Sequence, residues 1–275
     1  MSETAATRPR ALITGAGSGL GLALARRYAR AGHDIAVADL NMERAESAVV
    51  QLDAIGGAHF AVAVDVADAE SVEAMRAAVA LRWPEGFDVL INNAGVATAG
   101  SVVESPLADW HWVIGINLMG VVHGMKAFAP MFQRRRRGHI LSTASFAAIA
   151  GAPGIASYGT TKAAVVALSE GLRGEMHPHG VNVSVICPSF FKTNLLETAR
   201  GPDDRFRKFV GGLMEKARES ADDIAGYVFD AASRGEFMII PTAPERLRWR
   251  LKRYLPNYYF RKLMQAYRKI SARAG

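Results

Sequence analysis

The sequence predicts a single α/β domain, a doubly wound parallel sheet flanked by helices, followed by a basic amphipathic helical extension. Apolar segments of strand length alternate with helix patterns from residue 10 to about residue 242. This alternation is the chain order that builds a parallel sheet with helices on both faces. A glycine-rich turn joins the first apolar segment to the first helix pattern. With 275 residues and 50% hydrophobic content, the chain can bury the core that such a fold needs.

The two ends of the chain differ from the predicted domain. Residues 1–9 form a polar leader that we expect to be mobile, without the apolar segment of a secretory signal. From Glu245 onward, ten Lys or Arg residues accompany this one acid, which gives a charge of +9. Since the whole chain carries +7, residues 1–244 carry −2. The basic charge therefore belongs to the extension, residues 243–275, which argues against a nucleic-acid-binding domain.

Three observations bear on the setting of the protein. No run of 18 or more apolar residues is present, so we expect no membrane span. The single cysteine, Cys187, lies in an apolar run, which predicts a buried, inert thiol and fits a reducing cytoplasm. No Cys, His and Asp residues have the spacing of a metal site, so we expect His111 and His123 at the surface or in the core.

The first strand is predicted over residues 10–14 and runs into the turn TGAGSGLG. A helix pattern follows and ends near Gly32. A strand, a glycine-rich turn and a helix together present backbone N–H groups and the positive end of the helix dipole to a pyrophosphate. The sequence thus predicts a dinucleotide site at Thr14, Gly15, Gly17, Ser18, Gly19, Leu20 and Gly21.

The second predicted strand, DIAVAD, ends in Asp39. An acid at this position accepts hydrogen bonds from the adenosine ribose hydroxyls and repels a 2′-phosphate, which favours NAD and leaves NADP as the alternative cofactor. Another interpretation makes Asp39 the N-cap of the next helix. We expect Arg44 on the exposed face of that helix.

Two more strand–helix units follow. HFAVAVDV is a predicted strand before a helix over about residues 69–82, and FDVLINNAG is a predicted strand that ends in a pair of asparagines. Ser105 and Pro106 have the pattern of the N-cap and first position of a long helix. This helix contains Asn117, which is unfavourable inside a helix and therefore indicates a specific role. It ends in residues 134–137, four arginines that we expect to be solvated.

Three polar residues follow and carry the predicted chemistry. The segment HILSTASF predicts a buried strand that ends in Ser145. Tyr158 and Lys162 lie four residues apart, which places both on one helix face. A nearby ammonium stabilises a phenolate and lowers the pKa of the phenol from about 10, as a general acid or base requires. The alternative is an ordinary exposed helical pair.

These motifs resemble those of the classical short-chain dehydrogenase/reductase family. The resemblance rests on Ser145, Tyr158 and Lys162, on the G-x-x-x-G-x-G turn and on NNAG, and it covers about residues 8–242. It implies a Rossmann-type catalytic domain over residues 10–242, a nicotinamide cofactor, and hydride transfer between that cofactor and a secondary alcohol or ketone.

The resemblance also implies roles for single residues. Tyr158 is the general acid/base, Ser145 hydrogen-bonds the substrate oxygen, Lys162 lowers the pKa of Tyr158 and holds the nicotinamide ribose, and Asn117 supports a water relay to Lys162. Ser189 departs from the family pattern, which has glycine after the proline. Further cofactor contacts are implied for Asp65, Val66, Asn93, Ala94, Gly95, Pro188 and Thr193.

The substrate is predicted from apolar segments around the site. About residues 189–220 take the place of the family's substrate lid and carry several large apolar side chains. Together with small residues after Ser145 they suggest a lipophilic alcohol or ketone, steroid-like or long-chain. The alternatives are an NADPH-dependent carbonyl or 3-oxoacyl reductase and a non-catalytic cofactor-binding or membrane-scaffold protein.

Aromatic and basic residues alternate along the C-terminal extension. Such a segment can pack on the domain or on a second subunit, lie on an anionic membrane, or bind another partner. We expect a cytoplasmic protein, with membrane association through this extension as the alternative. The family resemblance implies a homodimer or homotetramer.

Overall fold

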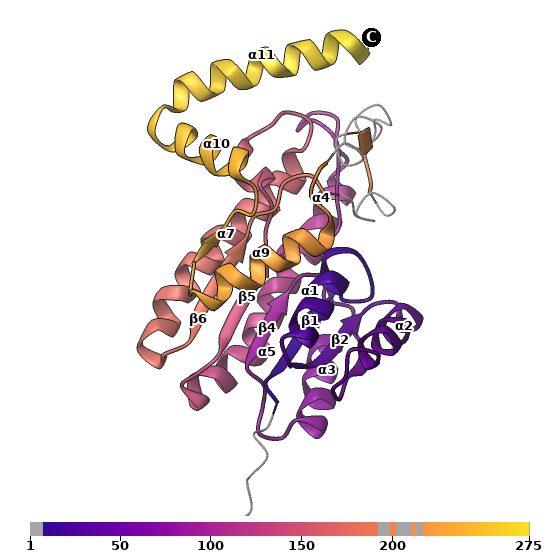
Figure 1. Cartoon of the computed structure of the whole chain (residues 1–275). Coiled ribbons are helices and arrows are strands. Elements are labelled where there is room, and N and C mark those ends of the chain that lie inside the picture. Colours follow the sequence, from indigo (N-terminus) through magenta and orange to yellow (C-terminus); the bar gives the residue numbers. More distant parts are fainter. Residues whose placement is uncertain (1–7, 192–198, 202–210, 213–216, 275) are drawn as a thin grey trace, which may run out of the picture.

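The computed structural model describes residues 8–191, 199–201, 211–212 and 217–274. Seven parallel strands form one sheet in the order β3-β2-β1-β4-β5-β6-β7, with helices on both of its faces (Figure 1). The predicted doubly wound parallel sheet is therefore confirmed. The strands are β1 (Arg10–Thr14), β2 (Asp34–Asp39), β3 (Phe60–Ala63), β4 (Val89–Asn92), β5 (His139–Thr143), β6 (Asn182–Ile186) and β7 (Met238–Ile239).

The strand order reverses between β1 and β4. The chain builds outward from β1 through β2 to β3 and then returns to the other side of β1, where β4 pairs with it. At such a switch point the turns after the two strands separate and leave a crevice, which is where open α/β sheets bind ligands. The turn after β1 is the glycine-rich one, and the turn after β4 is the asparagine pair.

The helices cover the sheet in two layers, and each layer encloses an apolar core. One core lies against α1, α2 and α9, and the other against α3, α5 and α7. Successive strand residues point to opposite cores, as Leu12 and Ile13 do. The helices are α1 (Gly19–Arg30), α2 (Met42–Asp53), α3 (Ala69–Arg82), α4 (Leu107–Ile114), the π-helix η1 (Gly115–Met119), α5 (Gly120–Arg135), α6 (Ala147–Ala150), α7 (Ala156–Met176), the 3-10 helix η2 (His177–His179), α9 (Ala221–Ser233), α10 (Ala243–Tyr254) and α11 (Pro256–Ala274).

Two of the predicted helix ends differ from the structure. Pro106 is the N-cap residue of α4 rather than its first helical residue, because its ψ of 143° is extended, and the helix begins one residue later. The arginines at the end of α5 are not all solvated. The side chain of Arg135 is 15% exposed, pairs with Asp88 at 3.0 Å and donates to the Phe87 carbonyl. Arg136 then ends the helix in the left-handed region with φ of 52°.

The stretch Leu107–Arg135 forms one long helical path through α4, η1 and α5. Its mean hydropathy reaches 1.3, so by length and composition it could cross a membrane, which sequence inspection for uninterrupted apolar runs did not find. The same criterion also selects core helices of globular proteins. Here Val121, Met125, Phe128 and Phe132 pack into the core, which accounts for the apolar composition.

Candidate active site

The turns after β1 and β4 are joined by hydrogen bonds. The Thr14 hydroxyl accepts the backbone N–H groups of Asn93 and Ala94 at 3.0 and 3.1 Å. Gly15 has φ of 64°, and a Cβ there would lie 2.8 Å from the Ala94 Cα. Only glycine therefore permits this backbone path and this close approach. The sequence prediction placed these residues in a cofactor cradle, and the structure brings them together.

The glycine turn leads directly into α1. A Cβ on Gly21 would collide with the carbonyl oxygen of Gly15, so the helix can start only this close to the turn because Gly21 has no side chain. Ser18 is the N-cap residue, and its side chain makes no capping hydrogen bond within the described residues. The first N–H groups of α1 are thus available to an anionic group, as the positive end of a helix dipole favours.

Asp39 lies beside this turn at the end of β2. Its carboxylate accepts the Gly17 N–H at 2.9 Å and the Asn41 N–H at 3.0 Å. The N-cap of α2 is Asn41, whose side chain accepts the Arg44 N–H at 2.9 Å, so the interpretation of Asp39 as that cap is wrong. Arg44 is exposed, as expected, and a Cβ on Gly17 would meet its Cβ at 2.8 Å. An acid and a base therefore flank the glycine turn.

Asn93 ties three strands together. Its side-chain amide donates to the carbonyl oxygens of Thr14 and Gly15 at 3.1 and 3.3 Å, and its oxygen accepts the Thr143 hydroxyl at 3.2 Å. Thr14, Asn93 and Thr143 end or follow β1, β4 and β5. Sequence reasoning missed Thr143, although a polar residue at the end of a buried strand is a signal that could have indicated it.

Asp65 and Val66 follow β3 on the next loop. The carboxylate of Asp65 accepts the Ala67 N–H at 2.9 Å, and Asp65 is exposed. The Val66 carbonyl lies 2.9 Å from a ring nitrogen of His123. His123 is half-buried and thus packs between α5 and this loop. The adenine contact implied for Asp65 and Val66 stays a prediction.

Tyr158 and Lys162 lie in the first two turns of α7. Lys162 is 3% exposed and donates from Nζ to the Thr143 carbonyl at 2.8 Å. Its Nζ lies 5.9 Å from the centroid of the Tyr158 ring. The pair is therefore part of a half-enclosed site, and the interpretation as an ordinary exposed helical pair does not describe it.

Burial governs the pKa values of this pair. It raises the pKa of Tyr158, while the Ser145 hydroxyl lowers it by hydrogen-bonding the phenolate form. Burial lowers the pKa of Lys162 to about 8. The resemblance implied that Lys162 lowers the pKa of Tyr158, but here the ammonium is directed to a backbone carbonyl. Desolvation has the largest effect on both groups and disfavours both charged forms.

Ser145 follows β5 and lies against the end of β6. Its Oγ accepts the Ala147 N–H at 3.1 Å and donates to the Pro188 carbonyl at 3.5 Å. The Phe146 N–H also donates to Pro188, at 2.8 Å, so the backbone after Cys187 keeps a defined path beside Ser145 despite Ser189. Cys187 is fully buried and burial raises its pKa to about 12, which agrees with an inert thiol. Thr193 and most of the predicted lid lie outside the described residues.

Asn117 lies inside η1, a π-helical turn in which the backbone hydrogen bonds span five residues instead of four. Its fully buried side chain accepts the Val96 N–H at 2.8 Å and donates to the Val96 carbonyl at 2.9 Å. A Cβ on Gly95 would lie 3.1 Å from the Asn117 Oδ1 and 3.2 Å from the Lys162 Nζ. Asn117 and Lys162 thus approach the same glycine, and the water relay between them stays a prediction.

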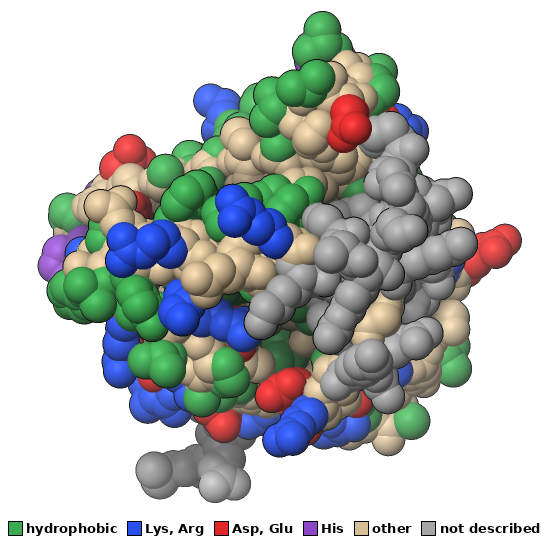
Figure 2. Space-filling model, turned by 90° about the horizontal axis from the view of Figure 1, so that it is seen from above, with side chains coloured by type: hydrophobic (Ala, Val, Ile, Leu, Met, Phe, Trp, Pro, Cys, Tyr) green, Lys and Arg blue, Asp and Glu red, His purple; other side chains and the backbone are tan. Residues whose placement is uncertain are grey.

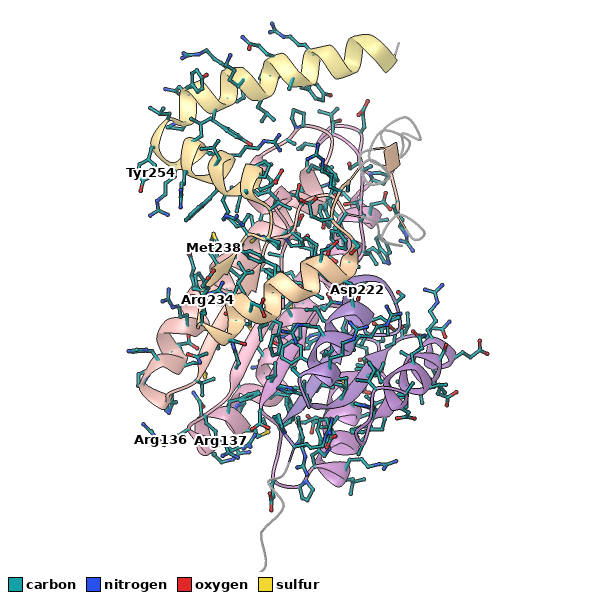
Figure 3. The ribbon with its side chains drawn as sticks, viewed as in Figure 1. Arg136, Arg137, Asp222, Arg234, Met238 and Tyr254 are labelled. Atoms are coloured by element: carbon teal, nitrogen blue, oxygen red, sulfur yellow. The ribbon has the colours of Figure 1, made fainter. Side chains whose placement is uncertain are left out.

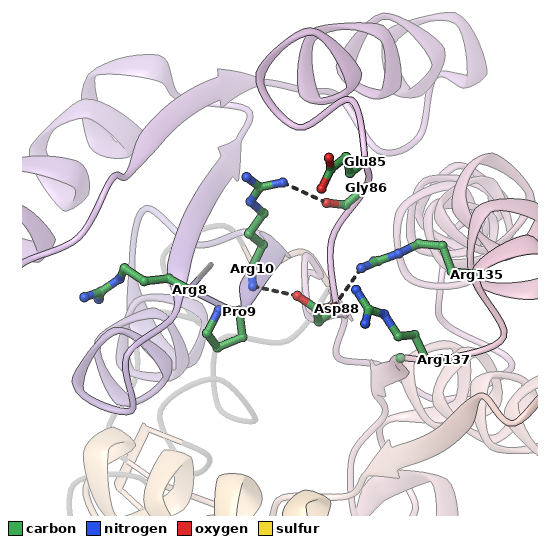
Figure 4. A pocket seen from close by; sticks show the side chains of 9 residues that line it. Arg8, Pro9, Arg10, Glu85, Gly86, Asp88, Arg135 and Arg137 are labelled. Atoms are coloured by element: carbon green, nitrogen blue, oxygen red, sulfur yellow. Dashed lines mark hydrogen bonds and ion pairs between the residues drawn. The ribbon is translucent and has the colours of Figure 1, made fainter. Parts of the chain in front are cut away.

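Away from the candidate site, a cavity opens at the amino ends of the strands. It has a volume of about 320 Å³ and is lined by Arg8, Arg10, Arg135 and Arg137 around Asp88 (Figure 4). The Asp88 carboxylate accepts the Arg10 N–H and pairs with Arg135, each at 3.0 Å. These contacts join β1, β4 and α5, so we assign the cluster a structural role. In the described part of the chain, no group of three or more His, Cys, Asp or Glu side chains could hold a metal ion.

Comparisons with known proteins agree with this geometry. Residues 9–203 match the family described as short chain dehydrogenase. The chain is 33% identical over 242 residues to the probable oxidoreductase EphD of Mycobacterium tuberculosis, and it spans only 40% of the length of that relative. It is 34% identical over 243 residues to a 1-deoxy-11-beta-hydroxypentalenate dehydrogenase of Streptomyces exfoliatus, which covers 87% of this chain and 85% of the relative.

Two solved structures illustrate the structural similarity. A short chain dehydrogenase/reductase of Burkholderia phymatum in complex with NAD aligns with a TM-score of 0.83 at 32% identity, over 90% of this chain and 93% of that one. A short-chain dehydrogenase of Sphingobium yanoikuyae in complex with NADPH aligns with a TM-score of 0.76 at 28% identity, over 94% and 95%. The fold, the matched residues and these relatives lead to one conclusion. The chain belongs to the short chain dehydrogenase family.

Proposed function

We propose that this chain is an oxidoreductase that transfers a hydride between a nicotinamide dinucleotide and the carbinol carbon of a secondary alcohol or ketone. The observation that carries the proposal is the convergence of Ser145, Tyr158 and Lys162, with Asn117 behind them, at the carboxyl edge of the sheet. The glycine turn lies at this same edge. The bound cofactor supplies the hydride chemistry, and the protein aligns and polarises the reactants.

The cradle fits a dinucleotide. Gly15 and Gly21 have no room for a Cβ, and the first turn of α1 presents open N–H groups beside them. A pyrophosphate is the ligand for which such a turn is suited. The rest of the turn consists of Gly17, Ser18, Gly19 and Leu20. The loops after the neighbouring strands contain Val66, Ala94, Gly95 and Pro188.

NAD is the cofactor that we propose in preference to NADP. The carboxylate of Asp39 accepts the Gly17 N–H of the glycine turn, and this position beside the turn supports a role for Asp39 in binding the adenosine ribose. A negative charge there accepts ribose hydroxyls and repels a 2′-phosphate. The Burkholderia relative binds NAD and the Sphingobium relative binds NADPH, so family membership leaves this choice to residues such as Asp39.

Tyr158 moves the substrate proton. On oxidation the phenolate takes the hydroxyl proton of the alcohol, and on reduction the phenol returns it. With substrate bound, the hydroxyl proton of Ser145 turns to the substrate oxygen and stabilises the charge that develops there. Lys162 holds the ribose of the nicotinamide and, when it turns from the Thr143 carbonyl toward Tyr158, stabilises the phenolate.

A lipophilic substrate is our proposal for the substrate class. Three of the five residues after Ser145 are small, namely Ala147, Ala148 and Ala150, and all three are half-buried. The Streptomyces relative is named a 1-deoxy-11-beta-hydroxypentalenate dehydrogenase. The second candidate is an NADPH-dependent carbonyl or 3-oxoacyl reductase, and the NADPH complex of the Sphingobium relative is the observation in its favour.

The experiment is a panel of alcohols and ketones assayed with NAD and NADP by absorbance of the reduced nicotinamide. We expect turnover of steroid-like or long-chain secondary alcohols with NAD. Tyr158→Phe should lower kcat by about 10²- to 10⁴-fold, the range of general acid–base catalysis, while Tyr254→Phe, at a residue that is 75% exposed, leaves it unchanged. Turnover of small polar alcohols alone would overturn the proposed substrate class. Absence of cofactor binding and turnover would favour the scaffold alternative.

Assembly is part of the same proposal. We expect a homodimer or homotetramer built on the long helices α5 and α7, as the family resemblance implies, in a cytoplasmic protein. Light scattering of the purified chain gives the mass directly, and a monomeric mass at assay concentration contradicts it.

A further inference from the structure

The C-terminal extension is attached to the domain by one side of α10. The Arg246 guanidinium donates to the Tyr227 hydroxyl at 3.1 Å and to the carbonyls of Ile240 and Pro241 at 2.8 Å. Glu245 is 7% exposed and pairs with Arg248 at 2.8 Å. The contacts of Arg246 join α10 to α9 and to the residues after β7, so this end of α10 is attached to the domain.

The start of α11 is attached beside the candidate active site. The Tyr259 hydroxyl donates to the Ala150 carbonyl at 3.0 Å, and the Lys252 ammonium donates to the Ile149 carbonyl. Both carbonyls belong to α6, which begins two residues after Ser145. The helix pair therefore lies next to the segment that follows Ser145, and α11 lies at the outer end of the molecule (Figure 1).

The outer surface of the helix pair is apolar and aromatic. Tyr254 is 75% exposed and projects outward at the turn between the helices (Figure 3), and Leu247 and Phe260 are 67% and 61% exposed. Leu255, Tyr258 and Tyr267 are exposed as well. Isolated exposed apolar residues are ordinary, but a group of them on two adjoining helices indicates an interaction surface.

The residues of α11 are arranged as in an interfacial helix. Phe260, Leu263, Met264 and Tyr267 follow at spacings of three, four and seven, so they form one stripe along the helix. Arg261 and Arg268 each follow a member of the stripe and flank it, and both are exposed. Viewed from above, Lys and Arg side chains lie among hydrophobic ones on this face (Figure 2).

The charge of this surface selects the kind of partner. After Glu245 the sequence contains no acid, and Glu245 itself is paired within α10. A second copy of this surface would bring two segments of charge +9 together. An anionic lipid bilayer instead complements the cations, while its interface accepts aromatic side chains.

We propose that the outer face of α10 and α11 binds the surface of an anionic lipid bilayer, with α11 lying in the plane of the interface. The stripe of α11 enters the headgroup region, and its flanking arginines contact lipid phosphates and carboxylates. The contacts of Tyr259 and Lys252 with α6 then hold the mouth of the active site close to the bilayer, where a lipophilic alcohol is concentrated. The binding itself requires no catalysis.

The test is co-sedimentation of the full chain with vesicles of phosphatidylcholine alone and with vesicles that also contain the anionic lipid phosphatidylglycerol. We expect binding to the anionic vesicles that weakens with added salt. Each cation near such a surface contributes about fivefold in affinity, so Arg261→Gln with Arg268→Gln should weaken binding about 25-fold. Phe260→Ser with Tyr267→Ser should weaken it at every salt concentration.

The matched control is Arg30→Gln with Arg134→Gln. It removes the same charge from two exposed residues in the last turns of α1 and α5, outside the C-terminal extension. Equal losses in the two double arginine variants, or equal binding to both kinds of vesicle, would overturn the proposal. Thermal melting of each variant separates lost folding from lost binding. If light scattering without lipid shows that the Phe260 and Tyr267 changes dissociate an oligomer, a second copy covers this face and the bilayer does not.

Discussion

Replacing Asp39 with Asn tests the assignment of cofactor preference with little change in shape. Asn keeps one side-chain oxygen, which can accept the Gly17 N–H that now lies 2.9 Å from the carboxylate, but it removes the acceptor of the Asn41 N–H and the negative charge. We therefore expect the glycine turn to persist and the discrimination between NAD and NADP to fall. Thermal melting of the cofactor-free variant measures the separate cost of the lost hydrogen bond from Asn41.

Its magnitude follows from Coulomb's law. Two unit charges about 4 Å apart near a protein surface repel by roughly 4 kcal/mol at an effective dielectric constant of 20. Each 1.4 kcal/mol is a factor of ten, so the full repulsion is worth about 10³-fold in the ratio of NAD to NADP affinity. Screening by salt lowers this, so at physiological ionic strength we expect a loss of preference of about 10- to 10³-fold.

The assay is a titration of each cofactor followed by the shift in thermal midpoint, since a ligand that binds only the folded state stabilises it by mass action. Glu43→Gln is the matched control, because it removes one exposed charge from the first turn of α2, four residues from Asp39. An unchanged ratio of affinities in Asp39→Asn would refute the electrostatic reasoning, as would an equal change in Glu43→Gln.

Three further predictions concern the cradle, the buried lysine and the extension. Gly21→Ala should abolish cofactor binding, because the new Cβ would collide with the glycine turn. In the control Gly174→Ala, no atom lies within 4 Å of the new Cβ, so thermal melting should show α7 stabilised by about 0.5–1 kcal/mol. The pKa of Lys162 is lowered to about 8 in the folded state from 10.5, so the folded chain loses this proton first and stability rises between about pH 8 and 10.5. The free energy of unfolding should rise by about 3 kcal/mol over this range. Denaturant titrations of the cofactor-free protein measure this rise, and Lys162→Met should abolish it. The same pH dependence in the variant would argue against the buried ammonium. Tyr259→Phe should cost about 1 kcal/mol of stability through the lost hydrogen bond to Ala150, and no change in midpoint would show that this contact does not hold the extension.

Much of the fold follows from local patterns in the chain. The alternation of apolar strands and helix patterns predicted a parallel sheet, because parallel strands need a crossover and helices supply it. The helix pattern after the glycine-rich turn predicted α1 and an end near Gly32, and the helix ends at Arg30. Such features depend on residues within one turn or one strand of each other, so the sequence contains the information directly.

The candidate site could be predicted only as a set of residues. Gly15, Asn93 and Tyr158 were identified by motif, but their contacts depend on which strands become neighbours. The hydrogen bond from Lys162 to Thr143 joins a helix to a strand nineteen residues away. The widened helical turn around Asn117 has a sequence signal only in the unfavourable residue itself.

By itself, the sequence determined the order of the strands and helices, the glycine positions that a tight turn requires, and the separation of charge between the domain and its basic extension. The tertiary structure alone decided that Arg135 is paired with Asp88, that burial opposes the charged forms of both Tyr158 and Lys162, and that Tyr259 attaches the extension beside Ser145. The physical reason is that pairing, desolvation and docking depend on distances between segments remote in sequence, and these distances exist only after the sheet has assembled.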